Sequence, residues 1–142
     1  MDNEDAEPRT LMLQELGILI TERQEAGDKI IIGIDANEDI RGPTIQQFLS
    51  DYHLKEAVTS RHGHTTPSTC DKNTNNVPID GILLSADLDI SATGYLPFGD
   101  GPRSDHRVLW ADITKSSALG DYRRDDHFKA LPSARLPRPH SH

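Results

Sequence analysis

The segment "KIIIGID", residues 29–35, constrains the fold of this chain more than any other stretch. Four of the six positions from Lys29 to Ile34 are isoleucine, and no polar side chain interrupts the run until Asp35. Continuous apolar runs of this length are typical of strands that are covered on both faces. We therefore predict a strand over residues 29–34 that is buried on both faces.

Hydrophobic periodicity predicts two helices around this strand. The first is expected over residues 8–26, with Pro8 in its first turn and Gly27 just past its end. Its inward face is expected to carry Met12, Leu13, Leu16, Leu19 and Ile20. The second helix is expected within residues 41–57, is entered through Pro43, and turns inward the side chains of Ile45, Phe48 and Leu49.

Three further strands are expected within residues 77–85, 88–98 and 106–113, after a loop over residues 59–76. This order of elements predicts an α/β (α+β) domain over residues 8–113, with a mixed β-sheet and flanking helices. Residues 114–142 are polar, rich in proline and without periodicity. We predict that they form a disordered tail.

Composition limits the possible partners. The chain has 142 residues and a formal net charge of -8, and residues 1–113 hold nine basic and twenty acidic side chains. A freestanding nucleic-acid binder normally shows a basic face. An anionic substrate would therefore need a metal ion to offset these carboxylates, or another segment that brings positive charge. Cys70 is the single cysteine and excludes an internal disulfide, which favours a reducing compartment. With no signal-like start and no apolar stretch of about 20 residues, we expect an intracellular protein without membrane association.

Polar residues stand where the apolar strands begin or end. Asp35 and Asn37 follow the isoleucine run, Asp80 lies inside "VPIDGILLS", and Asp105 and His106 precede "RVLW". Each position alone has an ordinary interpretation as a turn residue, a helix N-cap, a solvent-facing carboxylate or a surface histidine. Together, at the ends of neighbouring strands, they are expected to converge on one edge of the sheet, where α/β folds bind ligands.

The segments "GIDAN" (33–37), "IDGILLS" (79–85) and "SDH" (104–106) resemble the endonuclease/exonuclease/phosphatase superfamily of metal-dependent phosphodiesterases. The resemblance spans roughly residues 10–113. It implies the C-terminal half of a four-layer sandwich, whose first half supplies an asparagine and a glutamate as metal ligands; nothing before Ile30 offers that pattern. The stretches "PSTC" and "GYLPFGDGPRSDH" are similar to retroelement-type endonuclease domains, which favours DNA as the substrate.

The resemblance also implies roles for individual residues. Asp35 would orient or activate the attacking water, and Asn37 would hold the scissile phosphate or the nucleophile. His106 would hydrogen-bond a phosphate oxygen, and Asp80 would orient its imidazole and favour its protonated form. Asp105 would help to bind Mg²⁺ or Mn²⁺.

Two alternatives to a nucleolytic phosphodiesterase stay open. The chain could be a truncated, non-catalytic remnant that retains these residues, or a phosphatase or phosphodiesterase acting on lipid or inositol phosphates. The sequence departs from the family at Ile34, where the family usually has glycine before the aspartate. Thr69 resembles a family threonine near the site, and Ser104 is expected to shape the turn before His106.

Overall fold

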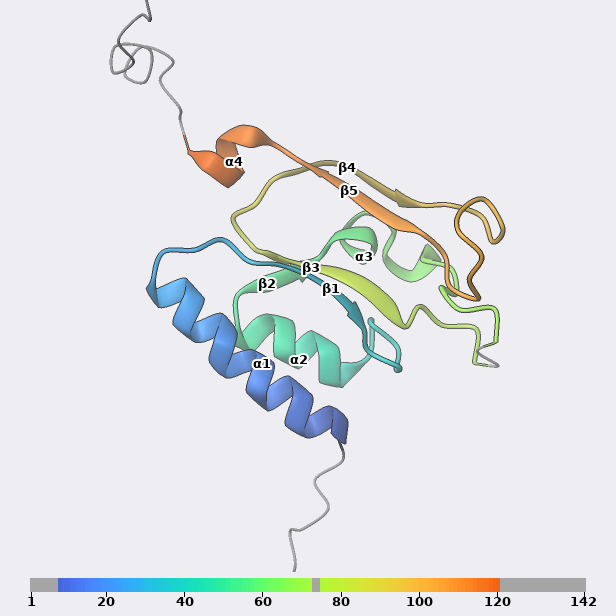
Figure 1. Ribbon diagram of the computed structural model, residues 1–142, viewed down its shortest axis with the longest axis horizontal. Coiled ribbons are helices and arrows are strands. Elements are labelled where there is room, and N and C mark those ends of the chain that lie inside the picture. Colours follow the sequence, from blue (N-terminus) through green and yellow to red (C-terminus); the bar gives the residue numbers. More distant parts are fainter. Residues whose placement is uncertain (1–7, 73–74, 121–142) are drawn as a thin grey trace, which may run out of the picture.

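The computed structural model describes residues 8–72 and 75–120. Four α-helices, a short 3-10 helix (η1) and five strands follow one another in these ranges (Figure 1). The helices are α1 (Pro8–Glu25), α2 (Pro43–Asp51), α3 (Ala57–His62) and α4 (Lys115–Leu119), with η1 at Gly63–Thr65. The strands are β1 (Ile31–Asp35), β2 (Leu54–Glu56), β3 (Asp80–Ser85), β4 (Ile90–Tyr95) and β5 (Leu109–Ile113).

The strands form two small antiparallel sheets. One has the order β1-β3-β2, and the other pairs β4 with β5. The α+β class is confirmed, but the prediction of one mixed sheet is wrong because every pairing between these strands is antiparallel. The strand order of the first sheet could not be predicted from local sequence patterns, because β3 pairs with two strands that precede it by 24 residues or more along the chain.

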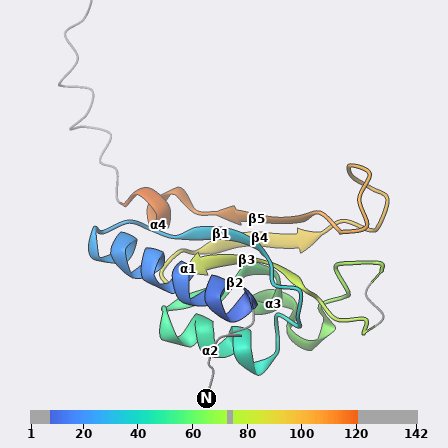
Figure 2. The same ribbon diagram turned by 60° about the horizontal axis from the view of Figure 1, so that its bottom comes forward.

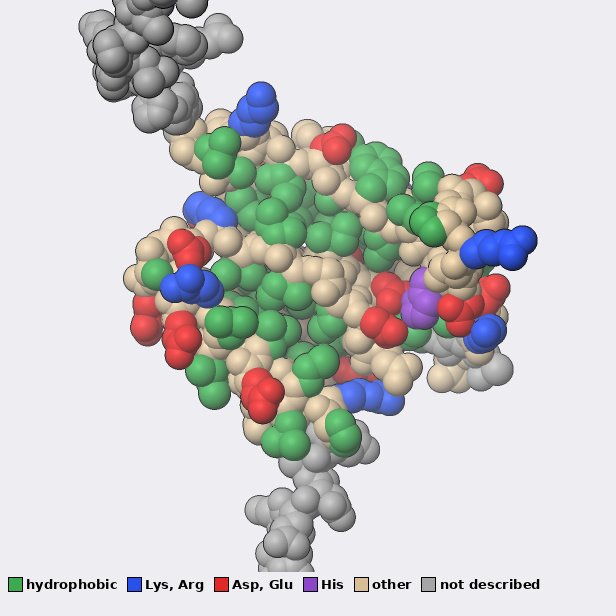
Figure 3. All heavy atoms as spheres, viewed as in Figure 1, with side chains coloured by type: hydrophobic (Ala, Val, Ile, Leu, Met, Phe, Trp, Pro, Cys, Tyr) green, Lys and Arg blue, Asp and Glu red, His purple; other side chains and the backbone are tan. Residues whose placement is uncertain are grey.

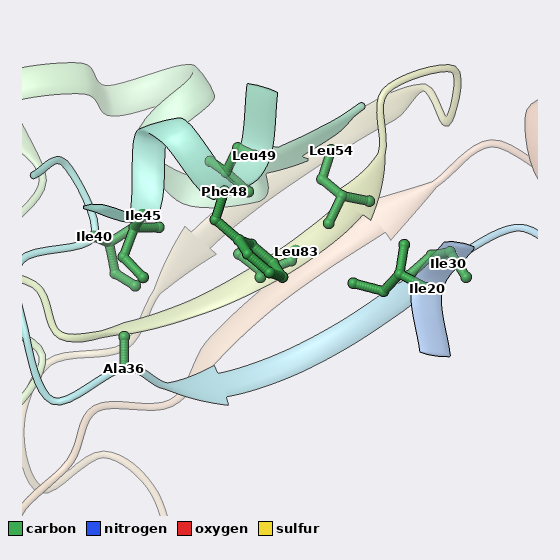
Figure 4. Close-up of a cluster of buried hydrophobic side chains, with 9 residues drawn as sticks. All are labelled: Ile20, Ile30, Ala36, Ile40, Ile45, Phe48, Leu49, Leu54 and Leu83. Atoms are coloured by element: carbon green, nitrogen blue, oxygen red, sulfur yellow. The ribbon is translucent and has the colours of Figure 1, made fainter. Parts of the chain in front are cut away.

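The strand that is covered on both faces is β3, not β1. Leu83 and Leu84 of β3 are fully buried in two different hydrophobic clusters. Leu83 belongs to the cluster under α1 and α2, where it lies near Phe48 (Figure 4). Leu84 belongs to the cluster under α3, β4 and β5, on the other side of the sheet in Figure 1.

The isoleucine run instead forms an edge strand. Ile32 and Ile34 pack against the first cluster, whereas Ile31 remains 56% exposed. The prediction that residues 29–34 are buried on both faces is therefore wrong. Exposed apolar side chains also lie on β5, at Trp110, and just before it, at Val108. Figure 3 shows hydrophobic side chains gathered along this side of the molecule, over β5 and between β1 and α1.

Helix α1 forms where it was predicted, but its buried face differs from the predicted one. Ile20 is buried, and Leu13 and Leu16 pack partly against the first cluster. Met12 and Leu19, also expected inward, are exposed. The helix is rotated because Gly17, which has no side chain, lies against the Tyr52 ring: a Cβ there would be 2.1 Å from the phenolic oxygen. Figure 2 shows α1 lying along the strands.

The predicted second helix is shorter than residues 41–57. Helix α2 ends at Asp51, His53 adopts a left-handed conformation (φ 54°), and β2 follows. Residues 59–65, expected in a loop, all belong to α3 or η1. The signal missed here is Glu56, which both ends β2 and caps α3 through Val58 and Thr59.

The predicted tail begins later than residue 114. Thr114 donates a backbone hydrogen bond to Asp89 (2.9 Å), α4 follows, and Ala118 packs against the second cluster. Because these contacts order residues 114–119, the prediction of disorder is wrong there, and the remainder, residues 121–142, lies outside the described residues. In the described part of the chain, no helix is both long and apolar enough to cross a bilayer.

Candidate functional site

Three of the predicted site residues meet at one end of the β1–β3 pair. Asp35, the last residue of β1, is the register partner of Asp80, the first residue of β3. Asp80 Oδ2 lies 2.7 Å from Nδ1 of His106, which precedes β5. One ligand atom from each of Asp35, Asp80 and His106 lies within 4.8 Å of the others. On the face shown in Figure 3, histidine lies among acidic side chains.

A short bridge between two loops positions His106. Cys70 and His106 form an isolated antiparallel bridge. Two backbone hydrogen bonds of 2.8 Å flank the pair, from Asp71 N–H to the Asp105 carbonyl and from Arg107 N–H to the Thr69 carbonyl. The Ser104 hydroxyl accepts the His106 N–H at 3.0 Å, so Ser104 does shape the turn.

Thr69 fixes the position of Asp80. Its side chain is almost completely buried, and its hydroxyl oxygen accepts the backbone N–H groups of Ile79 (2.9 Å) and Asp80 (3.1 Å). A buried N–H needs an acceptor, and Thr69 supplies one just where β3 begins. Thr69 is thus a positioning residue, one step behind the Asp80–His106 pair.

The electrostatics of the pair favour a charged imidazole. The hydrogen bond to Asp80 raises the pKa of His106, and the negative charges of Asp80, Asp35 and Asp105 add to this effect. Partial burial acts in the opposite direction but does not outweigh the carboxylates. The Asp80 carboxylate also selects the tautomer, because Nδ1 must donate to it and Nε2 is left to face outward.

Asp105 lies on the other side of the imidazole from Asp80. Its Oδ1 is 3.9 Å from His106 Nε2, and its Oδ2 is 3.6 Å from the Lys72 ammonium. A backbone hydrogen bond within the residue lowers the pKa of the Asp105 carboxyl, and the charge of Lys72 lowers it further. The Asp105 side chain is 37% exposed, so an ion can approach this carboxylate from solvent.

Asn37 lies beside this group without being part of the Asp80–His106 contact. Its backbone N–H donates to Asp35 Oδ1 (2.9 Å), and its φ of 52° is a left-handed conformation that asparagine tolerates well. Its side chain lines an open hollow of about 660 Å³ together with Cys70 and Lys72. Asp35 and Asn37 therefore form the turn that the Asp-x-Asn spacing allowed. The bond from the Asn37 N–H uses Oδ1 of Asp35 and leaves Oδ2 outside it.

Comparisons with protein-family models, with curated proteins and with solved structures give no match to this chain. The site must be interpreted from its own geometry. The sequence singled out Asp35, Asp80, Asp105 and His106 through their places at strand ends, and the structure brings Asp35 and Asp80 close to His106. It missed the pairing of Cys70 with His106, because a two-residue bridge between loops leaves no periodic signal.

Proposed function

We propose that this chain is a metal-dependent phosphodiesterase domain of nuclease type. The proposal rests on one observation above all, the 2.7 Å contact between Asp80 and His106 with Asp35 and Asp105 on either side. A carboxylate-oriented imidazole beside two further carboxylates suits phosphoryl chemistry, which needs a positioned nucleophile and stabilised charge.

Each residue has a distinct task in this proposal. His106 donates from Nε2 to a non-bridging phosphate oxygen, while Asp80 holds Nδ1 and keeps the ring in place. Asp35 accepts a proton from the attacking water or orients it. Asn37 contacts the phosphate or the nucleophile from the wall of the neighbouring hollow.

Asp105 would hold the divalent ion. Mg²⁺ and Mn²⁺ prefer oxygen ligands, and Mg²⁺ is often bound through only one or two carboxylates together with substrate phosphates. The exposed Asp105 carboxylate, next to the place assigned to the phosphate, fits that pattern. When bound, the ion would neutralise charge on the phosphate.

We further propose that the two small sheets belong to the second half of a four-layer sandwich, and that DNA is the substrate. The apolar side chains exposed on β1, α1 and β5 support the first point, because patches of this kind usually bind another layer or partner. The first half of the fold is the partner we assign to this surface. The assignment of DNA as the substrate rests on the similarity of residues 67–70 and 94–106 to retroelement-type domains.

The test is hydrolysis of duplex DNA and of a chromogenic phosphodiester by the purified chain, with Mg²⁺ and with Mn²⁺. We expect weak turnover. Asp35 and Asp80 face His106, so Asp105 is the one carboxylate of this group that is left to hold the ion. The His106→Ala variant should lose this turnover, while His53→Asn, at an exposed left-handed position, should retain it. Metal-dependent turnover that survives His106→Ala would contradict the proposed function.

A further inference from the structure

The bridge that positions His106 also places a thiol beside it. In an antiparallel pair whose flanking residues make the hydrogen bonds, the two central residues are the closely spaced kind, with Cα atoms about 4.5 Å apart and side chains on one face. Cys70 and His106 are such a pair, because the bonds run from Asp71 to Asp105 and from Arg107 to Thr69. Asp105 completes the group: one ligand atom each of Cys70, Asp105 and His106 lies within 4.8 Å of the others.

This donor set differs in kind from the one assigned to Mg²⁺. A thiolate is a soft ligand that selects zinc-like ions, and imidazole suits the same ions, whereas Mg²⁺ takes oxygen. The second contact of the histidine also matters. Zinc-bound histidines almost always donate their other ring N–H to a carboxylate or carbonyl, which fixes the tautomer. Asp80 already makes that contact at Nδ1, so Nε2, the nitrogen nearer Asp105, is ready to coordinate.

We propose that Cys70, His106 and Asp105 bind a thiophilic divalent metal ion such as Zn²⁺. Around a tetrahedral Zn²⁺, nitrogen, oxygen and sulfur ligands lie about 3.3–3.6 Å from one another. The Nε2–Oδ1 separation of 3.9 Å is therefore only about half an ångström too wide. Three protein ligands leave a fourth position for water. Binding releases to solvent the thiol proton of Cys70 and, where the imidazole is charged, the proton on Nε2 of His106.

The surroundings allow an ion to reach the site and favour its charge. Cys70 borders two open hollows, one shared with Asn37 and Lys72 and the other with Arg107. Lys72, whose side chain is 79% exposed, is the cation now nearest Asp105 and can swing away when an ion takes its place. The carboxylates of Asp80 and Asp35 lie just behind the imidazole and add negative charge.

This site would oppose the chemistry proposed for the same edge. Nε2 cannot coordinate a metal and donate to a phosphate oxygen at once, and Asp105 cannot serve both ions. Zn²⁺ would therefore inhibit a Mg²⁺-dependent reaction by occupying His106. Only this consequence rests on the proposed function, since metal binding itself needs no substrate.

Cobalt absorption tests the binding directly, because Co²⁺ occupies zinc sites and a thiolate ligand adds a charge-transfer band in the near ultraviolet. Cys70 is the only cysteine in the chain, so such a band can come from no other residue. We expect the reduced full chain to give this band with tetrahedral visible absorption, and Zn²⁺ to remove both by competition. Cys70→Ser should abolish the band. Asp80→Ala, which removes the acceptor behind the ring, should weaken binding roughly 10- to 100-fold.

His53→Asn removes an exposed imidazole elsewhere and should leave the cobalt spectrum unchanged. A wild-type chain that shows no charge-transfer band with excess Co²⁺ would overturn the proposal. So would a band that persists with equal affinity in both His106→Ala and Asp105→Asn, because the thiol would then bind without these partners. A chain that binds Co²⁺ as expected but hydrolyses no phosphodiester would refute the proposed function and leave the metal site standing.

Discussion

Glu56 provides the sharpest test of how this fold is held together. Its carboxylate is 2% exposed and accepts four hydrogen bonds. Oε1 receives the N–H groups of Val58 (3.2 Å) and Ile82 (3.1 Å), and Oε2 receives the N–H and hydroxyl of Thr59, both at 2.6 Å. One side chain thus caps α3 and joins it to β3.

Glu56→Ala should lower the free energy of unfolding by about 3 kcal/mol. Loss of a helix N-cap contributes about 1 kcal/mol, and leaving the partly buried Ile82 N–H without an acceptor contributes a further 1–3 kcal/mol or so. Glu56→Gln separates shape from acceptor capacity. The amide keeps one acceptor oxygen, so it can serve one of the two pairs of donors and should cost about half as much.

Urea unfolding of the three proteins measures these differences, with the exposed Glu22→Ala as the matched control, expected within about 0.5 kcal/mol of wild type. Gly81→Ala approaches the same carboxylate from the other side, because its Cβ would lie 2.9 Å from Glu56 Cγ. It should destabilise the chain by about 1–3 kcal/mol. A loss below about 1 kcal/mol for Glu56→Ala would refute the role assigned to this carboxylate.

Three further predictions concern α1, the site and pH. Gly17→Ala gains about 1 kcal/mol of helix propensity but places a Cβ 2.1 Å from the Tyr52 oxygen, so thermal unfolding should show a net loss of about 1–3 kcal/mol; a stabilised variant would contradict this. Thr69→Val removes the acceptor of two N–H groups and should lower the free energy of unfolding, measured in urea, by about 1–3 kcal/mol, whereas Thr69→Ser should be close to wild type. If Thr69→Val were as stable as Thr69→Ser, the role of the hydroxyl would be ruled out. The hydrogen bond from Asp80 raises the pKa of His106 above the ordinary value of 6.5, so the folded chain holds this proton more tightly than the unfolded chain. The stability gained from this tighter binding is complete below about pH 6.5 and is lost as the pH rises through the folded pKa. Wild type should therefore lose more free energy of unfolding than His106→Ala between about pH 6 and pH 8. Parallel profiles of unfolding free energy against pH would contradict this.

The sequence predicted the parts of the fold that local patterns determine. Helix α1 and the approximate positions of β1, β3, β4 and β5 follow from periodicity. The convergence of Asp80 and His106 on one edge follows from polar residues at the ends of apolar strands, whereas their direct pairing was what the family resemblance implied. The separation of the strands into two sheets could not be predicted in this way, because pairing depends on contacts between distant segments.

The errors have particular physical causes. The isoleucine run looked central because its composition does not distinguish an edge strand with an exposed face from a buried strand. The buried face of α1 was misjudged because a glycine, which carries no hydrophobic signal, makes the closest contact with Tyr52. Strand β2 and helix α3 were missed because one glutamate ends the first and begins the second, in place of the usual serine, threonine or aspartate cap.

The place of β3 between two hydrophobic clusters has a consequence for cooperativity. Leu83 and Leu84 are neighbours in the chain, yet each completes a different cluster. Disordering β3 would open both clusters at once, so the sheet that contains β3 cannot melt while the β4–β5 sheet keeps its packing. A substitution in the helix layer that destabilises β3 should therefore also weaken the packing of β4 and β5.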